Sequence, residues 1–300
     1  MKNKLITTIC ILVALTLSIL AFAPFDCGKL DGSNWMSQLN GDLELNQVSI
    51  PGSHDSGATH SIGDVAGKCQ SLSVGEQLKI GVRFFDIRLQ QRKGVLHLVH
   101  SFVDQNLRFD DVVSEFSAFL DQNPTEFLLI SIKEDADPVG STVDFATAVK
   151  TALEKRKERV NFGNSLPSTV GQARGKMHIL SRFNGDFGFA VHSGWRDSTS
   201  FEVNGAFVQD NYCISDENAK INDIIACFKE SATQKHVLTL NFTSCYFDYG
   251  FPPLYAGSTA KIINAWLLEN LDSHQGCLGV VISDFVTSEL VQKVYRRNYL

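Results

Sequence analysis

The sequence lacks a surplus of positive charge. It contains 27 Lys and Arg against 33 Asp and Glu, which gives a net charge of −6 over 300 residues. A field of this sign repels nucleic acid and the anionic face of a membrane. No nucleic-acid partner is therefore expected, although a local basic site remains compatible with the composition.

The chain also lacks internal repeats, low-complexity tracts and linkers beyond about residue 30. With 44% hydrophobic and 20% charged residues, it has the composition of a globular protein large enough to bury a full core. Neither CxxC nor a His/Cys ligand spacing occurs, so structural zinc is not expected. The simplest interpretation is one domain over residues 30–300.

One long hydrophobic run begins the chain. Lys2 and Lys4 precede the uncharged residues 5–23, which end in Ala-Phe-Ala like a secretory signal peptide. The same run is about as long as a minimal membrane span, and cleavage after Ala23 leaves Pro24 at the new terminus, so an uncleaved anchor is the alternative. The sequence predicts a protein that is secreted or faces an extracytoplasmic lumen, and that is membrane-anchored if residues 1–23 are retained.

Removal of residues 1–23 leaves an even number of cysteines, which in an exported chain allows up to three disulfides in any of 15 pairings. A buried free thiol is the alternative for each cysteine, and for Cys227, on an expected helix face, it is as well supported as a bridge. The six are Cys27, Cys69, Cys213, Cys227, Cys245 and Cys277.

Short apolar runs, several hydrophobic on both faces, predict eight strands that alternate with helical segments. The strands are QVSI before Pro51, VRFFDIRL (82–89), VLHLVH (95–100), FLLISIKE (127–134), KMHILSRF (176–183), AFVQDNY (206–212), HVLTLNFTS (236–244) and CLGVVISDFV (277–286). The helices are expected within 71–81, 111–122, 142–160, 216–232, 258–271 and 288–300.

This alternation predicts an α/β fold, an irregular (β/α)₈ TIM-type barrel in a single domain. Residues 88–95 are too few for a crossover helix, so a hairpin-like excursion is expected there. Residues 184–205, rich in Gly, Ser and Asn, predict a long loop.

In such a barrel the chemistry lies where the strands end. Charged residues are rarely buried unless they are paired, so ionisable side chains at seven of eight strand ends indicate a functional site. Histidines, acids and basic groups at one mouth suit acid-base chemistry on an anionic substrate such as a phosphate. The strand-end residues are His54, Asp55, Asp86, Arg88, His100, Lys133, Arg182, Asp210, Tyr212, Asn241 and Asp284.

Eight blocks in order resemble the catalytic X domain of phosphatidylinositol-specific phospholipase C, and the secreted bacterial enzymes most of all. They are VSIPGSHDSG, RFFDIR, the LxLxH pattern ending at His100, DQNPTEFLLISIK, GKMHILSRF, FVQDNY, LNFTS and VVISDF, from about residue 35 to residue 297. The resemblance implies an irregular TIM barrel and cleavage of phosphatidylinositol, or of a glycosylphosphatidylinositol anchor, into diacylglycerol and inositol 1,2-cyclic phosphate. A phosphatidylinositol-containing membrane or micelle is the implied partner, and a monomer is expected.

The resemblance also implies roles for the strand-end residues. His54 is the general base and His100 the general acid, oriented by Asp284 and Asp55 respectively, while Arg88 binds the phosphate. The implied catalytic set is His54, His100, Asp55, Arg88, Asp284 and Asp86. The implied substrate-binding set is Lys133, Arg182, Asp210 and Tyr212.

No metal or other cofactor is expected. The calcium-dependent branch of the family has acidic ligands where this chain has Arg88 and Lys133, and cations there repel Ca²⁺. Two alternatives stay open: a non-catalytic phosphoinositide-binding module, and a metal-dependent glycerophosphodiesterase-like barrel, which needs a carboxylate cluster in place of Arg88.

Several residues have a simpler explanation. His60, His97 and His192 are interpreted as structural or surface residues, and alternation puts His97 and His100 on opposite faces of one strand. Asn241 begins a glycosylation signal but lies in a strand, so modification is not expected. Phe187, Phe189 and Trp195, in the 184–205 loop, suit either a membrane interface or ordinary packing.

Overall fold

The computed structural model describes residues 30–61, 67–101, 103–247 and 256–300. Residues Asp31–Asn298 form one compact unit. The predicted signal segment, residues 1–23, and Cys27 lie outside the described residues. Among those described, no helix is long and apolar enough to cross a membrane.

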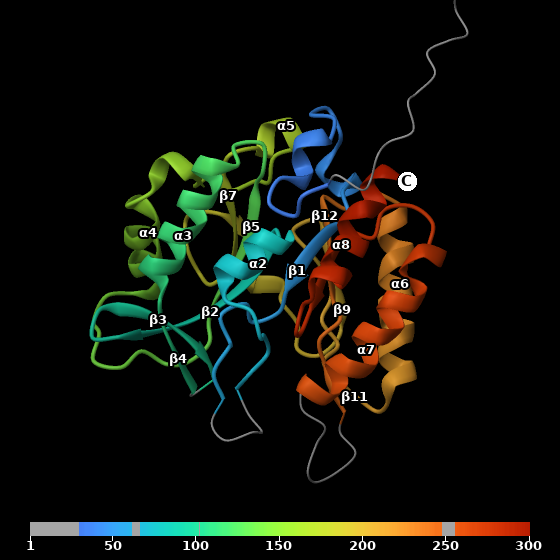
Figure 1. Ribbon diagram of the computed structural model, residues 1–300. Coiled ribbons are helices and arrows are strands. Elements are labelled where there is room, and N and C mark those ends of the chain that lie inside the picture. Colours follow the sequence, from blue (N-terminus) through green and yellow to red (C-terminus); the bar gives the residue numbers. More distant parts are fainter. Residues whose placement is uncertain (1–29, 62–66, 102, 248–255) are drawn as a thin grey trace, which may run out of the picture. The chain divides into compact units, whose positions relative to one another are not determined.

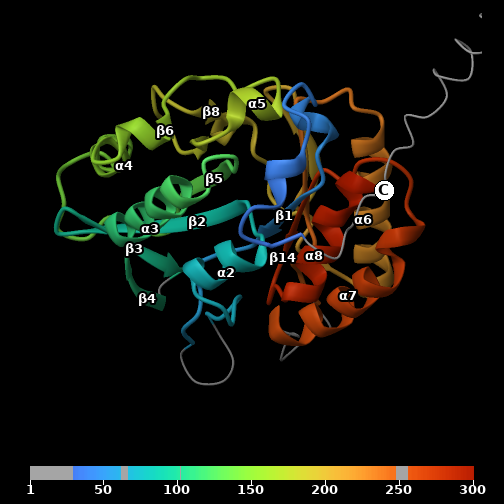
Figure 2. The ribbon, with the colours of Figure 1, turned by 45° about the horizontal axis from the view of Figure 1, so that its top comes forward.

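A curled parallel sheet forms the centre of this unit, and helices cover its outer side (Figures 1 and 2). Seven parallel strands lie in the order β7, β5, β2, β1, β14, β12, β10 within the described chain. Their bounds are β1 Ile50–Ser53, β2 Phe84–Arg92, β5 Leu128–Glu134, β7 Met177–Arg182, β10 Ala206–Gln209, β12 Leu238–Phe242 and β14 Val280–Ser283. The predicted irregular TIM-type barrel is confirmed.

The barrel is irregular for two reasons. First, β3 (Val95–His100) pairs antiparallel with β2, and β4 (Val103–Arg108) with β3, so the predicted hairpin is confirmed and β3 is not a barrel strand. Second, β9 (Ser200–Val203) borders β10 antiparallel, and no ladder among the described strands joins this edge to the edge formed by β6 (Val160–Asn161) and β7. Two short strands, β11 (Cys213–Ile214) and β13 (Tyr246–Phe247), form a separate pair.

The helices begin and end where local sequence caps them. Ser73 and Glu76 form a reciprocal capping box at the start of α2, and Gly81, with φ 115°, ends it in the left-handed conformation that glycine adopts without strain. The α-helices are α2 Val74–Ile80, α3 Phe109–Gln122, α4 Phe145–Glu154, α5 Val170–Ala173, α6 Glu217–Ala232, α7 Ala256–Asn270 and α8 Ser288–Arg296. The six predicted helices are confirmed, with shifts at their ends.

The 3₁₀ turns are η2 Trp35–Gln38, η3 Leu45–Gln47, η4 Lys157–Arg159, η5 His192–Gly194, η6 Leu271–Ser273 and η7 Arg297–Tyr299.

The first strand lies later than the sequence predicted. Residues 45–47 form η3, and β1 continues through Pro51 and Gly52. Proline is tolerated because Pro51 contributes only its carbonyl, which accepts from the backbone N–H of Arg83 at 2.9 Å. The loop predicted over 184–205 is also partly wrong, since it contains β8 (Phe189–Ala190), η5 and β9.

The predicted disulfides are wrong for the five cysteines that the structure describes. Cys69, Cys213, Cys227, Cys245 and Cys277 are free thiols, and all but Cys213 are buried. They lie on separate elements and contact other groups; the Cys277 sulfur, for example, accepts from the backbone N–H of Gly279 at 3.3 Å. Of the two interpretations given for Cys227, a disulfide or a buried free thiol, the structure supports the free thiol.

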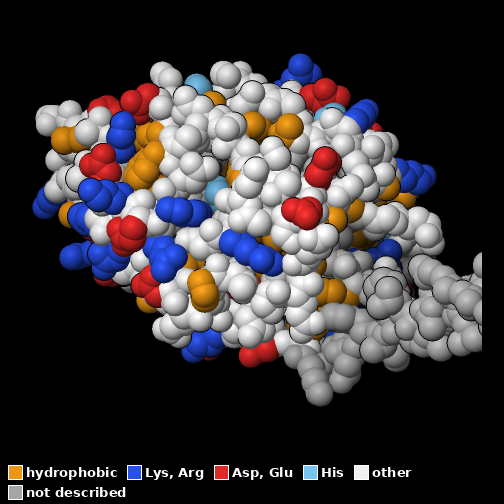
Figure 3. Space-filling model, turned by 90° about the horizontal axis from the view of Figure 1, so that it is seen from above, with side chains coloured by type: hydrophobic (Ala, Val, Ile, Leu, Met, Phe, Trp, Pro, Cys, Tyr) orange, Lys and Arg blue, Asp and Glu red, His pale blue; other side chains and the backbone are white. Residues whose placement is uncertain are grey.

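A buried ion pair closes the end of the barrel where the strands begin. Arg83, the residue before β2, is fully buried and pairs with Glu126 at 2.9 Å. The same guanidinium donates to the carbonyls of Gly32 and Ser33, which fixes the segment before η2. Figure 3 views this end, where basic and acidic side chains are interspersed rather than gathered into one patch.

Candidate active site

The opposite end of the barrel, where the strands finish, holds a cavity of about 880 Å³. This end carries β4 and β11 in Figure 1. Eight of the predicted site residues line the cavity: His54, Arg88, His100, Lys133, Arg182, Asp210, Tyr212 and Asp284. Asp55 and Asp86 lie just beneath its surface, 2% and 0% exposed.

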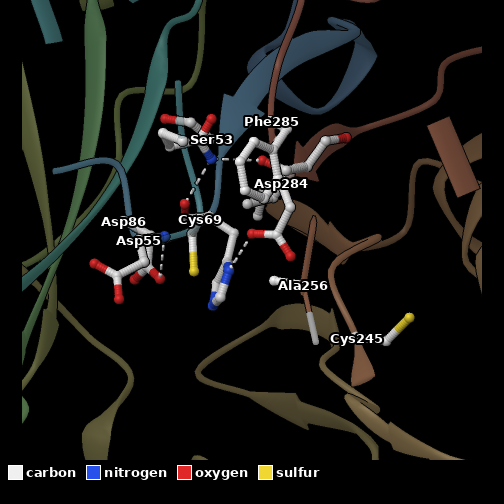
Figure 4. A network of polar contacts seen from close by, with 12 residues as sticks. Ser53, Asp55, Cys69, Asp86, Cys245, Ala256, Asp284 and Phe285 are labelled. Carbon is white, nitrogen blue, oxygen red and sulfur yellow. Dashed lines mark hydrogen bonds and ion pairs between the residues drawn. The ribbon is translucent and has the colours of Figure 1, made fainter. Parts of the chain in front are cut away.

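Asp284 holds the imidazole of His54. The two side chains leave the ends of the paired strands β1 and β14, and Nδ1 of His54 lies 2.7 Å from Oδ1 of Asp284, which is labelled in Figure 4. The other ring nitrogen, Nε2, lies 2.6 Å from Nη2 of Arg88, which can only donate. His54 is therefore protonated on Nδ1, and its Nε2 lone pair accepts from Arg88.

Neighbouring charges raise the pKa of His54 and so make it a stronger base. Burial lowers the pKa of His54, but the charge and hydrogen bond of Asp284, together with Asp86, outweigh burial and the Arg88 charge, and the pKa is raised overall. A base of this kind suits abstraction of a proton from a hydroxyl group.

Arg88 lies among three carboxylates. Its Nε donates to Asp86 at 3.1 Å, and the Asp55 and Asp135 carboxylates lie at 3.8 and 4.0 Å. Despite burial, these charges raise its pKa well above the usual value. Arg88 thus presents a permanent positive charge beside His54, where it can bind an anion.

Asp86 joins the two guanidinium groups of the site. Its carboxylate contacts Arg88 and also Nη1 of Arg182 at 3.4 Å, and it accepts from the backbone N–H of Asp55. Burial opposes ionisation, yet the two arginines hold the pKa of Asp86 far below its usual range. Asp86 therefore stays ionised and holds the guanidinium groups of Arg88 and Arg182 in position.

His100 and Asp55 form a looser pair. Nδ1 of His100 lies 3.9 Å from Oδ2 of Asp55. Burial lowers the pKa of His100, with Arg88 adding to the effect, while burial raises the pKa of Asp55 to about 7. The pair can therefore hold one proton near neutral pH, on either member, and release it readily.

Backbone strain accompanies these side chains. Asp55, Ser101 and Phe285 have positive φ angles of 39°, 56° and 47°, and each directly follows a site residue. Such strain costs on the order of 1–3 kcal/mol per residue and is found where function requires an exact side-chain placement. The backbone N–H of Ser101 donates to Asp135 at 2.7 Å, and that of Phe285 to the carbonyl of Cys69.

The far wall of the cavity combines cations with aromatic rings. The guanidinium of Arg182 lies 3.7 Å from the centroid of the Trp195 ring, and Nε1 of Trp195 donates to Asp210 at 3.1 Å. Tyr212 donates to Asp197 at the cavity rim. Flat rings beside alternating charges suit a polyhydroxylated ring, which has apolar faces and polar edges.

Three contributors escaped the sequence analysis. Asp135 contacts Lys133 at 2.7 Å, and strand alternation from Lys133 would have placed it on the same face. Gln70, fully buried, donates to the carbonyls of His54 and Ser283 and so fixes two strand ends. Cys69 lines the cavity, and no sequence signal predicted it.

Other residues fall outside the site. His97 contacts Asp104 on the β3–β4 hairpin instead of lining the cavity, as strand alternation predicted. Asn241 is fully buried and bonded to Gln209, which excludes glycosylation in the folded state. His60 and His192 do not line the cavity either.

The alternative of a membrane interface is wrong for the two phenylalanines of residues 184–205. Phe187 and Phe189 are 3% and 5% exposed and therefore pack within the protein. Trp195 lies on the cavity wall, as described above.

Comparison with known proteins confirms the resemblance found in the sequence. The family model PI-PLC X matches residues 42–156. The 1-phosphatidylinositol phosphodiesterase of Listeria monocytogenes is 23% identical over 275 residues, covering 88% of this chain and 84% of the relative. That of Staphylococcus aureus (strain Newman) is 28% identical over 199 residues, covering 60% and 64%.

Solved structures share the fold. A double mutant of the phosphatidylinositol-specific phospholipase C from S. aureus superposes with a TM-score of 0.77 at 23% identity, covering 87% of this chain and 96% of that one. The phosphatidylinositol-specific phospholipase C from L. monocytogenes has a TM-score of 0.70 at 21% identity, covering 89% and 98%. These similarities confirm the irregular TIM-type barrel.

Proposed function

We propose that this chain, which resembles the PI-PLC X family, is a phosphodiesterase, a phosphoric diester hydrolase or lyase, that cleaves phosphatidylinositol into diacylglycerol and inositol 1,2-cyclic phosphate. The observation that carries the proposal is the His54 imidazole, held by Asp284 on one nitrogen and facing Arg88 with the other. The names of the relatives support the same substrate class.

In this mechanism His54 removes the proton of the inositol 2-hydroxyl, and the resulting oxygen attacks the adjacent phosphorus. The phosphate displaces Arg88 from Nε2 and takes the hydrogen bonds of the guanidinium, which stabilises charge in the transition state. As the bond to the diacylglycerol oxygen breaks, His100 donates its proton to that oxygen. Asp55 either balances the positive charge of protonated His100 or supplies His100 with the proton that it donates.

The remaining wall binds the inositol ring. Lys133, Arg182 and Asp210 offer charged hydrogen-bonding groups to hydroxyls, and Tyr212 offers a ring face. Asp135 keeps Lys133 in place. Each of these residues contacts the cavity, so their loss would raise KM more than it lowers kcat.

Turnover without a metal is part of the proposal. The Arg88 guanidinium, surrounded by Asp55, Asp86 and Asp135, occupies the position where a metal-dependent enzyme would need a divalent cation. Export through residues 1–23, action on a lipid surface and a monomeric state remain predictions.

The test is to incubate the protein with phosphatidylinositol micelles in excess EDTA and to follow inositol 1,2-cyclic phosphate by phosphorus NMR. We expect product from wild type and from His97→Ala, which changes a histidine of the same hairpin outside the cavity, but none from His54→Ala or His100→Ala. Product only with added calcium would refute metal independence. No product under either condition would refute the proposed reaction.

A further inference from the structure

A thiol lies inside the candidate active site and has no role in the proposed reaction. Cys69 lines the cavity in the loop between β1 and α2 and is 1% exposed. Its sulfur lies 3.9 Å from Nδ1 of His100. In Figure 4 this sulfur is drawn between the carboxylate of Asp55 and the side chain of Asp284.

A buried carboxylate oxygen lies next to this thiol. Oδ2 of Asp55 has no hydrogen-bond partner, although the residue is only 2% exposed. It also lies 3.9 Å from Nδ1 of His100. A buried oxygen of this kind costs free energy unless something binds it, so its lone pairs are available to a ligand.

The three donor atoms have the spacing of a metal site. The Cys69 sulfur, the His100 ring nitrogen and the Asp55 carboxylate oxygen all lie within 4.8 Å of one another. Zinc bonds of about 2.3 Å to sulfur and about 2.0–2.2 Å to nitrogen and oxygen place tetrahedral ligands roughly 3.3–3.6 Å apart. The two 3.9 Å separations from His100 exceed these values by a few tenths of an ångström, and the sulfur and the carboxylate oxygen lie within 4.8 Å of each other, so the three side chains must move closer together around a bound ion.

We propose that Cys69, His100 and Asp55 bind a divalent ion of the zinc class, and that this ion inhibits the enzyme. The sulfur loses its proton to solvent on binding, and a cavity water takes the fourth position. The bound ion removes His100 and Asp55 from proton transfer. The inhibition rests on the proposed function, whereas the metal site does not.

A second triplet, His54, Cys69 and Asp284, shares the same thiol. It is the weaker candidate because Nδ1 of His54 already bonds Oδ1 of Asp284 at 2.7 Å. The Asp55 oxygen has no such partner to give up.

The charges around these three residues determine which metal ions the site prefers. The positive charge of Arg88, 3.8 Å from Oδ2 of Asp55, repels a bound cation. The carboxylates of Asp86 and Asp135 lie close to Arg88 as well and partly neutralise that charge. An ion that binds here must gain its affinity from the thiolate, which zinc and cadmium prefer and calcium and magnesium do not. The site therefore differs from a carboxylate calcium site in both ligands and ion preference.

The binding test uses the full chain, reduced and freed of metal, with Co²⁺ as a spectroscopic probe for zinc. We expect one equivalent of Co²⁺ to give a thiolate-to-cobalt charge-transfer band that Zn²⁺ abolishes by displacement. Cys69→Ser and Cys69→Ala should both lose the band. Cys213→Ser, which changes a partly buried thiol outside the cavity, should keep it.

The activity test titrates Zn²⁺ into the phosphatidylinositol assay without chelator, each variant being compared with its own metal-free rate. Wild type and Cys213→Ser should be inhibited, and the Cys69 variants should need at least about 100-fold more Zn²⁺, because loss of even an outer hydrogen-bond partner costs about 10–100-fold in metal affinity. Calcium should inhibit none of them.

Two results would overturn the inference: a cobalt band that survives in both Cys69 variants, or zinc sensitivity that they share with wild type. A chain that cleaves no phosphatidylinositol yet shows a Cys69-dependent cobalt band would overturn the proposed function and support the metal site. The two proposals therefore fail separately.

Discussion

Replacement of Asp284 by asparagine isolates what the carboxylate does for His54. The carboxylate is 2% exposed and accepts from Nδ1 at 2.7 Å. It therefore stabilises the tautomer with an unprotonated Nε2 and, in the proposed reaction, the imidazolium that forms when His54 takes its proton. A hydrogen bond to a charged group is worth about 1.5–3 kcal/mol, which alone corresponds to a rate loss of roughly 10- to 160-fold. Asparagine can also donate to Nδ1 and favour the opposite tautomer, and the same exchange in a Ser-His-Asp triad lowers kcat about 10⁴-fold.

We therefore expect Asp284→Asn to lower kcat by about 10²- to 10⁴-fold. Because Asp284 is a main cause of the raised pKa of His54, its loss lowers that pKa. His54 then stays unprotonated to lower pH, so the acidic limb of the kcat/KM profile moves to lower pH while the plateau falls. The assay is initial cyclisation rate against pH for both proteins in EDTA. A loss below tenfold, or an acidic limb that does not move, would refute the role of Asp284.

Three further substitutions test separate parts of the structure. Arg88→Asp should abolish activity in chelator, measured as cyclic phosphate release, and a rate near wild type would contradict the phosphate-binding role. Arg83→Met leaves Glu126 buried without a counter-ion and should lower the free energy of unfolding by about 3–5 kcal/mol in urea denaturation; a loss under about 1 kcal/mol would show that the pair is dispensable. Trp195→Phe removes the donor to Asp210 and should raise KM about tenfold with little change in kcat, whereas the reverse pattern would place Trp195 in the chemical step.

The sequence predicted those parts of the site that follow from strand periodicity. His54, Lys133 and Asp284 lie at the ends of parallel strands, and Arg88 lies near the end of the parallel β2–β5 pairing. Such ends meet at one face of a barrel whatever the detailed packing. His100 ends an antiparallel strand, but the short β2–β3 hairpin brings it to the same face.

The positions of Cys69, Gln70 and Trp195, unlike that of Asp135, depend on how loops fold back onto the barrel. Cys69 and Gln70 enter through the loop after β1, where Gln70 replaces strand pairing with side-chain hydrogen bonds to two strand ends. Trp195 directly follows η5, in the predicted 184–205 loop, where the sequence indicated a membrane interface or ordinary packing but no role in the site. Tertiary contacts fix these positions, and no local pattern encodes them.

The disulfide prediction failed for a related reason. Cysteine number and an expected export signal limit which bridges are possible, but whether two thiols meet depends on the three-dimensional positions of their elements. Here the barrel buries Cys227 and Cys277 on different elements, each with its own polar contact.

The buried carboxyl group of Asp55 lies beside His100 but lowers the stability of the fold when it is ionised. The substitution Asp55→Asn can separate these two effects. The carboxyl group is 2% exposed, its Oδ2 has no hydrogen-bond partner, and burial raises its pKa from 3.8 to about 7. Folding therefore favours the protonated carboxyl group of Asp55. The resulting stabilisation is fully present below the pKa of the unfolded chain, near 4, and is lost as pH rises through about 7. Three pKa units correspond to on the order of 4 kcal/mol.

Asp55→Asn keeps the shape of the side chain and tolerates the φ of 39°, since asparagine adopts the left-handed region nearly as well as aspartate. The variant should therefore be more stable than wild type at pH 8, should lose that advantage at pH 4, and should be less active throughout because His100 has lost its partner. Urea denaturation at the two pH values, beside the cyclisation assay, measures both effects. Equal stability differences at pH 4 and pH 8 would show that Asp55 does not titrate in this range, and full activity would show that His100 transfers its proton without it.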